Sequence, residues 1–164
     1  MIGRSRAWLA TILILIFFGI GLAWLWQYQN KPTNGDKKIS SIEQIVIEGV
    51  AFKVELATTS EEKAKGLSGR KTLCDQCGML FIYNTPDYYS FWMKETLIPL
   101  DIIWFNKDWQ VVDYLTFAQP QGAREEADLP IYRPKQKAQF ILEVPGGTTK
   151  RITNFKIGSK AGIL

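Results

Sequence analysis

The sequence predicts a mainly β fold: a β-rich α+β domain, built as a small antiparallel barrel or sandwich with one or two short helices, and preceded by a single transmembrane helix. Three observations lead to this prediction. One long apolar segment lies near the N-terminus, many short strand-like runs separated by Gly, Pro and Asn follow it, and helical patterns are few. A length of 164 residues fits one domain with an appendage.

The predicted transmembrane helix covers residues 7–26. This segment carries no charged side chain, and as a helix it would span about 30 Å, the thickness of a bilayer hydrocarbon core. Arg4 and Arg6 precede it, which favours a cytoplasmic N-terminus, residues 1–6, and export of the chain that follows. A cleaved signal peptide is the alternative, because Gly21-Leu22-Ala23 offers small residues at a suitable spacing.

Residues 27–41 have the composition of a linker. They are polar and contain Pro32 and Gly35. Residues 42–164 are then the exported domain. The predicted localisation is the cell membrane, with a single pass and the C-terminal domain on the extracytoplasmic side, so the membrane itself is a predicted partner through residues 7–26.

Short apolar runs predict the strands of the domain. Residues 52–56 alternate apolar and polar side chains, as a half-buried strand does, and Glu48-Gly49 predicts a turn to the strand before them. Residues 84–87 predict a second turn and residues 106–108 a hairpin loop. The predicted strands are 45–47, 52–56, 79–83, 88–93, 102–105, 109–115 and 140–142.

One short helix is predicted between the second and third strands. Thr59 fits the N-cap position, Glu62 completes a capping box, and Gly66 is a natural C-terminal stop. Residues 117–138 contain three prolines and an acidic group, and they predict a long connection. A solvated surface loop is favoured there over a binding lid.

The absence of histidine from the sequence restricts its chemistry. It excludes Ser-His-Asp and Cys-His catalysis and removes the usual zinc and copper ligands, so neither a metal nor a cofactor is expected. The formal net charge is +4, but Arg4 and Arg6, which precede the apolar segment, supply two of those charges. No clustered basic face is visible, so nucleic acid is not an expected partner.

Cys74 and Cys77 are the two cysteines of the sequence. In an exported domain an even count favours a disulfide. A bridge that closes so short a loop constrains the unfolded chain little, so it would mainly shape the loop before Gly78. Free thiols, a redox pair and a metal site shared with another chain are the alternatives. The strand-like run after Cys77 argues against the redox pair, which needs a helix N-terminus to lower the thiol pKa.

Several groups of residues form a distinctive set of motifs. They are Gly66-Leu67 with Arg70, Gly78-Met79-Leu80-Phe81, Phe91-Trp92-Met93-Lys94-Glu95-Thr96-Leu97-Ile98-Pro99-Leu100-Asp101-Ile102-Ile103, and Ile141-Leu142-Glu143-Val144 with Gly147. Together they resemble the domain of unknown function 192 family over about residues 50–160. The resemblance implies a compact, mainly antiparallel β structure with one or two short helices, often behind an export or anchor segment. It implies no particular activity.

Three positions depart from the family pattern. Glu95 stands where the family usually has Asn, Ser68 where it often has Met, and Gly158-Ser159 where it tends to have Gly-Asp. A role that the family builds on those three positions is therefore not carried over to this chain.

The charged, polar and aromatic residues inside the motifs are the candidate binding site. The ligand-binding candidates are Arg70, Trp92, Lys94, Thr96, Asp101 and Glu143. Asp101 heads an otherwise apolar strand, and a buried carboxylate must be paired. Two interpretations stay open. The candidates converge on one cleft that suits a sugar ring or a peptide carboxylate, or they form a buried ion-pair network that fixes strand register.

The leading functional hypothesis is a non-enzymatic module, tethered to the membrane, that binds an envelope ligand or another protein. A second hypothesis is a cell-envelope hydrolase with Asp101 and Glu143 as a carboxylate pair, which requires the two groups roughly 5–10 Å apart across one sugar site. A third is a thiol-redox protein that uses Cys74 and Cys77.

Overall fold

The computed structural model describes residues 20–25, 42–122 and 126–164. The chain divides into two compact units, Met1–Ser40 and Ser41–Leu164. In the first unit, residues 20–25 are helical and exposed. The rest of the predicted membrane segment 7–26 and the predicted linker 27–41 lie outside the described residues. Within the described ranges, no helix is both long enough and apolar enough to cross a bilayer.

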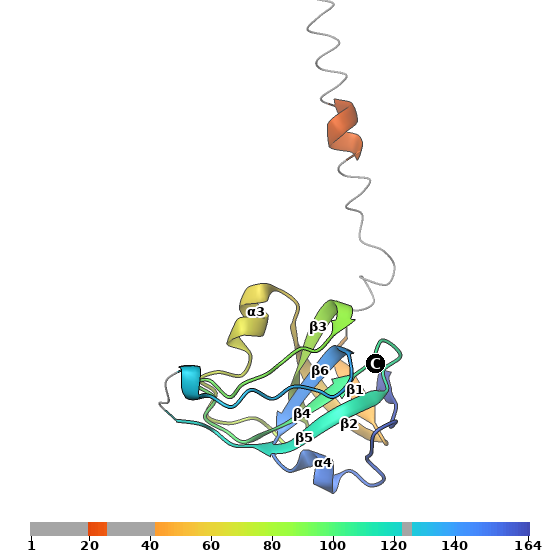
Figure 1. The fold of residues 1–164 in the computed structure, drawn as a ribbon. Helices are drawn as coiled ribbons and strands as arrows, with labels where there is room; N and C mark the ends of the chain where they lie inside the picture. The colour runs from red at the N-terminus through yellow and green to blue at the C-terminus, as the bar shows by residue number, and fades with distance from the viewer. Residues whose placement is uncertain (1–19, 26–41, 123–125) are drawn as a thin grey trace, which may run out of the picture. The chain divides into compact units, whose positions relative to one another are not determined.

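The second unit is built on one seven-stranded sheet (Figure 1). Its strands are β1 (Gln44–Ile47), β2 (Val50–Ala57), β3 (Cys77–Asp87), β4 (Leu100–Phe105), β5 (Val111–Ala118), β6 (Ala138–Pro145) and β7 (Ala161–Ile163). Their spatial order is β5-β4-β6-β3-β2-β1-β7. All neighbours are antiparallel except β2 and β3, which run parallel. The helices are α3 (Ser60–Lys65), the 3₁₀ turn η1 (Glu126–Asp128) and α4 (Thr148–Arg151), and Figure 1 shows α3 and α4 at opposite ends of the sheet.

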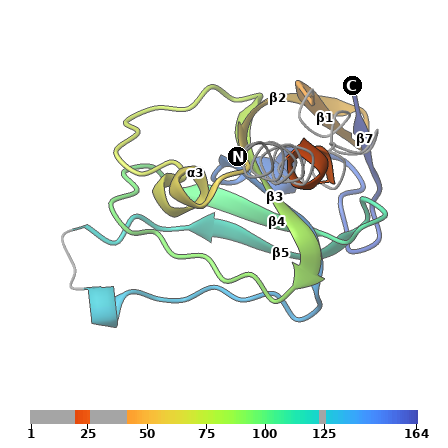
Figure 2. The ribbon, with the colours of Figure 1, turned by 90° about the horizontal axis from the view of Figure 1, so that it is seen from above.

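The sheet curls into a half-barrel, as the view in Figure 2 shows. The chain just before β7 joins its two ends, because it exchanges main-chain hydrogen bonds with the turn that leads into β5. The Val111 amide donates to the Ser159 carbonyl at 2.8 Å, and the Ala161 amide donates to the Trp109 carbonyl at 2.8 Å. The mainly β prediction is therefore confirmed.

Both faces of the central strands are buried, which explains the continuous apolar runs of the sequence. Every residue of β4 (Leu100–Phe105) is buried. The inner face of the curl carries side chains such as Ile103 and Leu142, and the outer face carries Ile102 and Ile141. Loop residues such as Leu67, Phe91 and Met93 belong to the outer cluster, so the domain has a second apolar core outside the sheet.

The predicted capping box and helix stop of α3 are confirmed. The Thr59 hydroxyl accepts from the Glu62 amide at 3.2 Å, and the Glu62 carboxylate accepts from the Thr59 amide at 2.9 Å. At the other end the Gly66 amide donates to the Glu62 carbonyl at 2.8 Å, with φ of +48° at Gly66. Local sequence thus fixes both ends of this helix.

The predicted turn at 84–87 and the predicted strand at 88–93 are wrong. Strand β3 (Cys77–Asp87) continues through the turn residues, because Asp87 still pairs with Ala138 of β6 across an irregularity in register. Residues 88–93 form a loop on the outer core that pairs with another segment at one bridge, Phe91 with Tyr132. The short elements α4 and β7 were not predicted.

Candidate functional site

Asp101 is buried completely and bound by main-chain donors. One carboxylate oxygen accepts from the amides of Phe117 and Gly147, each at 2.7 Å. The other accepts from the Thr149 amide at 2.7 Å and from the Thr149 hydroxyl at 2.6 Å. These four bonds tie β4 to the end of β5 and to the turn before α4. Asp101 therefore acts as an internal clamp, with its acceptor sites occupied by the protein.

The two carboxylates of the hydrolase hypothesis do not face each other. Asp101 of β4 pairs with Val144 of β6, whereas Glu143 pairs with Ile102. Paired residues point to the same side of a sheet and consecutive residues to opposite sides, so Asp101 and Glu143 lie on opposite faces. They share no cleft.

Glu143 forms the floor of a cavity in the outer core, between α3 and the segment 90–96. Only 4% of the residue is exposed. The cavity has a volume of about 70 Å³. Its lining is Lys63, Ala64, Lys65, Gly66, Leu67, Phe81, Tyr83, Ser90, Phe91, Trp92, Lys94, Thr96 and Glu143. Trp92, Lys94, Thr96 and Glu143, four of the six sequence candidates, are therefore brought together.

Two glycines let the main chain approach this cavity closely. A Cβ atom at Gly66 would lie 3.3 Å from the Phe81 ring and 3.9 Å from a Glu143 carboxylate oxygen. A Cβ atom at Gly78 would lie 2.6 Å from the Glu143 main-chain carbonyl oxygen. The residues after α3 and the start of β3 thus pack against Glu143 because both glycines lack a Cβ.

The walls of the cavity are aromatic and its rim is cationic. The ammonium of Lys63 lies 4.4 Å from the centre of the Tyr83 ring, and that of Lys94 lies 5.6 Å from the centre of the Trp92 ring. Both distances fit cation–π contacts. Trp92 is 40% exposed, so its ring is accessible to a ligand as well as to Lys94.

Burial dominates the electrostatics of the cavity. Loss of solvation raises the pKa of Glu143 to about 8. Loss of solvation, and then the nearby Tyr89 and Glu143, raise the pKa of Tyr83 to about 12. The pKa of Lys63 is lowered by its partial burial, against the opposing attraction of Glu62. The cavity therefore holds a carboxyl that keeps its proton at neutral pH, together with the phenol of Tyr83.

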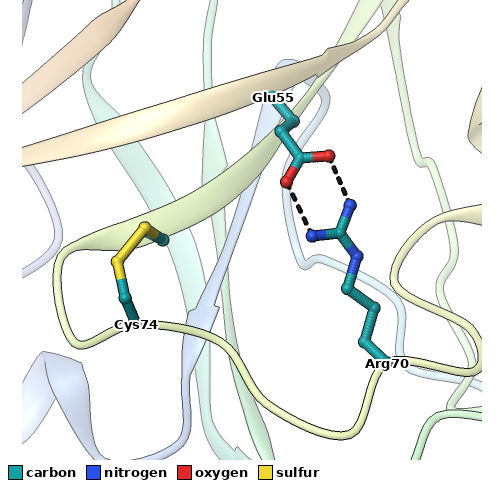
Figure 3. Close-up of a disulfide and its surroundings, with 4 residues drawn as sticks. Glu55, Arg70 and Cys74 are labelled. Carbon is teal, nitrogen blue, oxygen red and sulfur yellow. Dashed lines mark hydrogen bonds and ion pairs between the residues drawn. A yellow bond between two sulfur atoms is a disulfide. The ribbon is translucent and has the colours of Figure 1, made fainter.

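The remaining sequence candidates lie outside the cavity. Arg70 donates to Glu55 of β2 through both terminal nitrogens, one of them at 2.7 Å from Oε1 (Figure 3). This ion pair lowers the pKa of Glu55 and ties the segment after α3 to the sheet. Cys74 and Cys77 form a disulfide, as predicted, and it leads into β3 rather than into a helix.

Thr96 is 6% exposed, and its hydroxyl donates to the Lys94 carbonyl at 3.4 Å, which stabilises the turn that carries Lys94. The titratable cavity residues that sequence reasoning missed are Lys63, Lys65 and Tyr83. Their strand and helix were predicted, but no local pattern says that α3 covers Glu143. Within the described part of the chain, no three carboxylate or cysteine side chains gather as a metal-binding group.

A second cavity, of about 170 Å³, lies between the disulfide loop and α4. Asp75 and Gln76 of the loop, and Thr148 and Arg151 of the helix, form its polar lining. None of the sequence candidates for ligand binding lines it.

Comparison with known proteins gives a family but no activity. The profile of the DUF192 family, described as "Uncharacterized ACR", matches residues 43–163. A solved protein of unknown function from Novosphingobium aromaticivorans is 36% identical, with a TM-score of 0.66 over 74% of this chain and 84% of that one. A protein from Sinorhizobium meliloti, described as a candidate transcription regulator, is 24% identical, with a TM-score of 0.64 over 73% of this chain and 90% of that one; at this identity it shows the fold alone. No curated protein matches.

Proposed function

This chain belongs to the DUF192 family, and from that premise we propose that it is a membrane-tethered module that binds a ligand on the extracytoplasmic side. The family is uncharacterised and supplies no activity. The observation that supports the proposal is the cavity over Glu143, where a buried carboxyl, aromatic walls and a cationic rim meet. Polar groups that converge beside aromatic side chains in a concave site are typical of a binding site.

Binding is favoured over hydrolysis by the composition of this cavity. Glu143 is the one carboxylate among the lining residues that the structure describes. Hydrolysis of a glycoside needs two, and Asp101 is committed to main-chain donors on the other face of the sheet.

The size of the cavity limits what enters it. Its volume of about 70 Å³ is well below the roughly 300–1,000 Å³ of sites that enclose a whole small molecule. It accommodates a terminal group, while the remainder of the ligand lies against the exposed ring of Trp92. A ligand that is part of a larger envelope polymer or peptide fits this geometry.

The tether and its orientation rest on the sequence. Residues 7–26 carry no charge, and Arg4 and Arg6 precede them. The Cys74–Cys77 disulfide supports an extracytoplasmic location, because structural disulfides persist in oxidising compartments.

A ligand screen on the full-length chain in detergent tests the binding function. The library holds cell-wall sugars and peptides, and thermal unfolding reports binding. A ligand at a hundred times its dissociation constant adds about 2.7 kcal/mol to the free energy of unfolding. We expect hits whose stabilisation disappears in Trp92→Ala and persists in the control Lys150→Met, since exposed Lys150 lies on α4 outside the cavity. Hits that Trp92→Ala leaves unchanged would place the binding site elsewhere and refute the proposal.

Protease treatment of cells that express the full-length chain tests the tether. We expect the chain in the membrane fraction, with the domain digested once the outer face of the membrane is exposed. Deletion of residues 1–26 should release the domain from that fraction. Recovery of the full-length chain without membranes would contradict the tether. It would not affect the proposal that the cavity binds a ligand.

A further inference from the structure

We propose that the cavity over Glu143 recognises a carboxylate at the end of its ligand, such as a peptide C-terminus or an acidic sugar, and holds it between the rim lysines and the carboxyl of Glu143. This inference rests on the proposed function and names the ligand class of the same site. It follows from the charge of the lining, the position of Glu143 and the size of the cavity.

The lining is positively charged in either protonation state of Glu143. Three lysines, Lys63, Lys65 and Lys94, line the cavity, and Glu143 is the only acidic residue of that lining among those described. Cationic ligands are therefore disfavoured, and an anion is attracted to the rim. Lys63 and Lys94 also lie over aromatic rings, which limits where their ammonium groups can go.

The lysines supply donors at the rim of the cavity, and Glu143 supplies a donor at its bottom. As a neutral acid its O–H donates a hydrogen bond, and a carboxylate is an acceptor with two oxygens. The other titratable residues that line the cavity are Lys63 and Lys65 from α3, Tyr83 from β3 and Lys94 from the segment 90–96. The burial that raises the pKa of Glu143 to about 8 keeps this donor present at neutral pH.

The cavity selects a carboxylate by size. About 70 Å³ is room for about two groups the size of a water molecule, whose share of liquid volume is about 30 Å³. A carboxylate with its adjacent carbon fits, and an entire sugar ring does not. The ring or the peptide chain behind it then meets Trp92.

This arrangement couples ligand binding to protonation. Ionised Glu143 would repel a bound carboxylate, so the ligand binds the protonated form, and the affinity falls as pH rises through the pKa of about 8. Binding near that pH takes up a proton. Replacement of Glu143 by Gln keeps a donor of similar shape and removes the titration.

Isothermal titration calorimetry on the full-length chain in detergent tests the inference. The probes are acetyl-alanine and glucuronate, with acetyl-alanine amide and glucose as their uncharged counterparts. We expect one of the acids to bind, its neutral counterpart to bind about tenfold or more weakly, and Lys94→Met to cause a similar loss, as for one charge-assisted hydrogen bond. The control Lys150→Met should bind as the parent does. The two acids distinguish a peptide source from a sugar source.

The pH dependence separates a role of Glu143 in binding from a role in folding alone. From about pH 6 to about pH 9 the parent should lose affinity, while Glu143→Gln should bind with an affinity that does not change. Equal binding of acid and neutral probes, both abolished by Trp92→Ala, would overturn the carboxylate inference and leave the proposed function standing. Absence of binding by all four probes to folded protein would overturn the inference, and the wider ligand screen would then decide the proposed function independently.

Discussion

Asp101 and Glu143 are both buried carboxyl groups, and their surroundings give them opposite properties. Asp101 accepts four hydrogen bonds, three from main-chain amides, so its acceptor oxygens are fully used. Glu143 is held away from solvent beneath α3, with its pKa raised to about 8. The first residue stabilises the fold, and the second is placed to meet a ligand. Residue type alone does not distinguish them, because the difference lies in which donors surround each group.

Replacement of Asp101 by Asn should destabilise the protein strongly without altering the cavity. The amide nitrogen of Asn would face an N–H donor where an oxygen now accepts. We expect the free energy of unfolding to fall by about 3 kcal/mol or more, since buried donors lose their acceptors. Urea unfolding measures this. Exposed Asp108→Asn in the β4–β5 loop is the control and should change stability by less than about 0.5 kcal/mol. Similar stability of the two variants would contradict the clamp.

Glu143 should make stability depend on pH. Its pKa is 4.5 when unfolded and about 8 when folded, so between these values the folded state holds the extra proton. Stability therefore falls as pH rises across this window, by at most about 1.4 kcal/mol per pH unit, and levels off above it. Urea unfolding at a series of pH values should show this decline in the parent relative to Glu143→Gln. Parallel curves of stability against pH for the two proteins would rule out this contribution of Glu143.

Two departures from the family pattern contact each other. The Ser68 hydroxyl donates to the Glu95 carboxylate at 3.2 Å, and the Gly69 amide donates to the Glu95 carbonyl at 2.9 Å. Glu95 has a φ of +53°, a conformation that Asn adopts more readily than Glu, which accounts for the usual Asn at this position. The Ser68 hydroxyl thus holds the Glu95 side chain at this position.

At the level of elements, α3 is short and depends on its caps. A helix of this length has little intrinsic stability. Its position matters because Lys63, Lys65 and the following Gly66 form one side of the cavity. Loosening of α3 should therefore weaken binding without unfolding the sheet.

Removal of the Thr59 cap tests this dependence. Thr59→Ala removes the acceptor of the Glu62 amide and should cost about 1 kcal/mol. Hydrogen exchange of the α3 amides should speed up, whereas exchange of the β4 amides should stay slow. Ser60→Ala, at the first position of the helix, is the matched control. Equal exchange in all three proteins would show that packing, not the cap, holds the helix.

The elements also show where sequence reasoning succeeds. Capping and turn residues act locally, so α3 and its stop at Gly66 were predicted correctly. The end of β3 was not, because Asn84 to Asp87 have turn chemistry but continue the strand toward its partner at Ala138. Pairing across the sheet overrides the local preference there.

At the level of the whole molecule, the sequence predicted a mainly β domain but not its parallel pair. Strands β2 and β3 run parallel because the connection between them crosses back with α3, and the Arg70–Glu55 ion pair fastens that connection to the sheet (Figure 3). Strand patterns reveal which side chains are buried, not which strands pair. The cavity was therefore beyond prediction, since it exists only where this crossover meets the segment 90–96.

The ends of the domain are neighbours, which follows from the pairing of β1 with β7. The Leu164 amide donates to the Gln44 carbonyl at 3.1 Å, and the Gln44 amide returns a bond at 3.4 Å. The two ends can therefore be joined, and the chain opened elsewhere, without moving the strands. A circular permutant that joins Leu164 to Ile42 by a short Gly-Ser link and opens at Lys107 should fold and show the ligand response of the parent domain. Failure to fold would mean that the β4–β5 hairpin must remain covalently continuous, and success would make this loop a site for inserting a reporter domain.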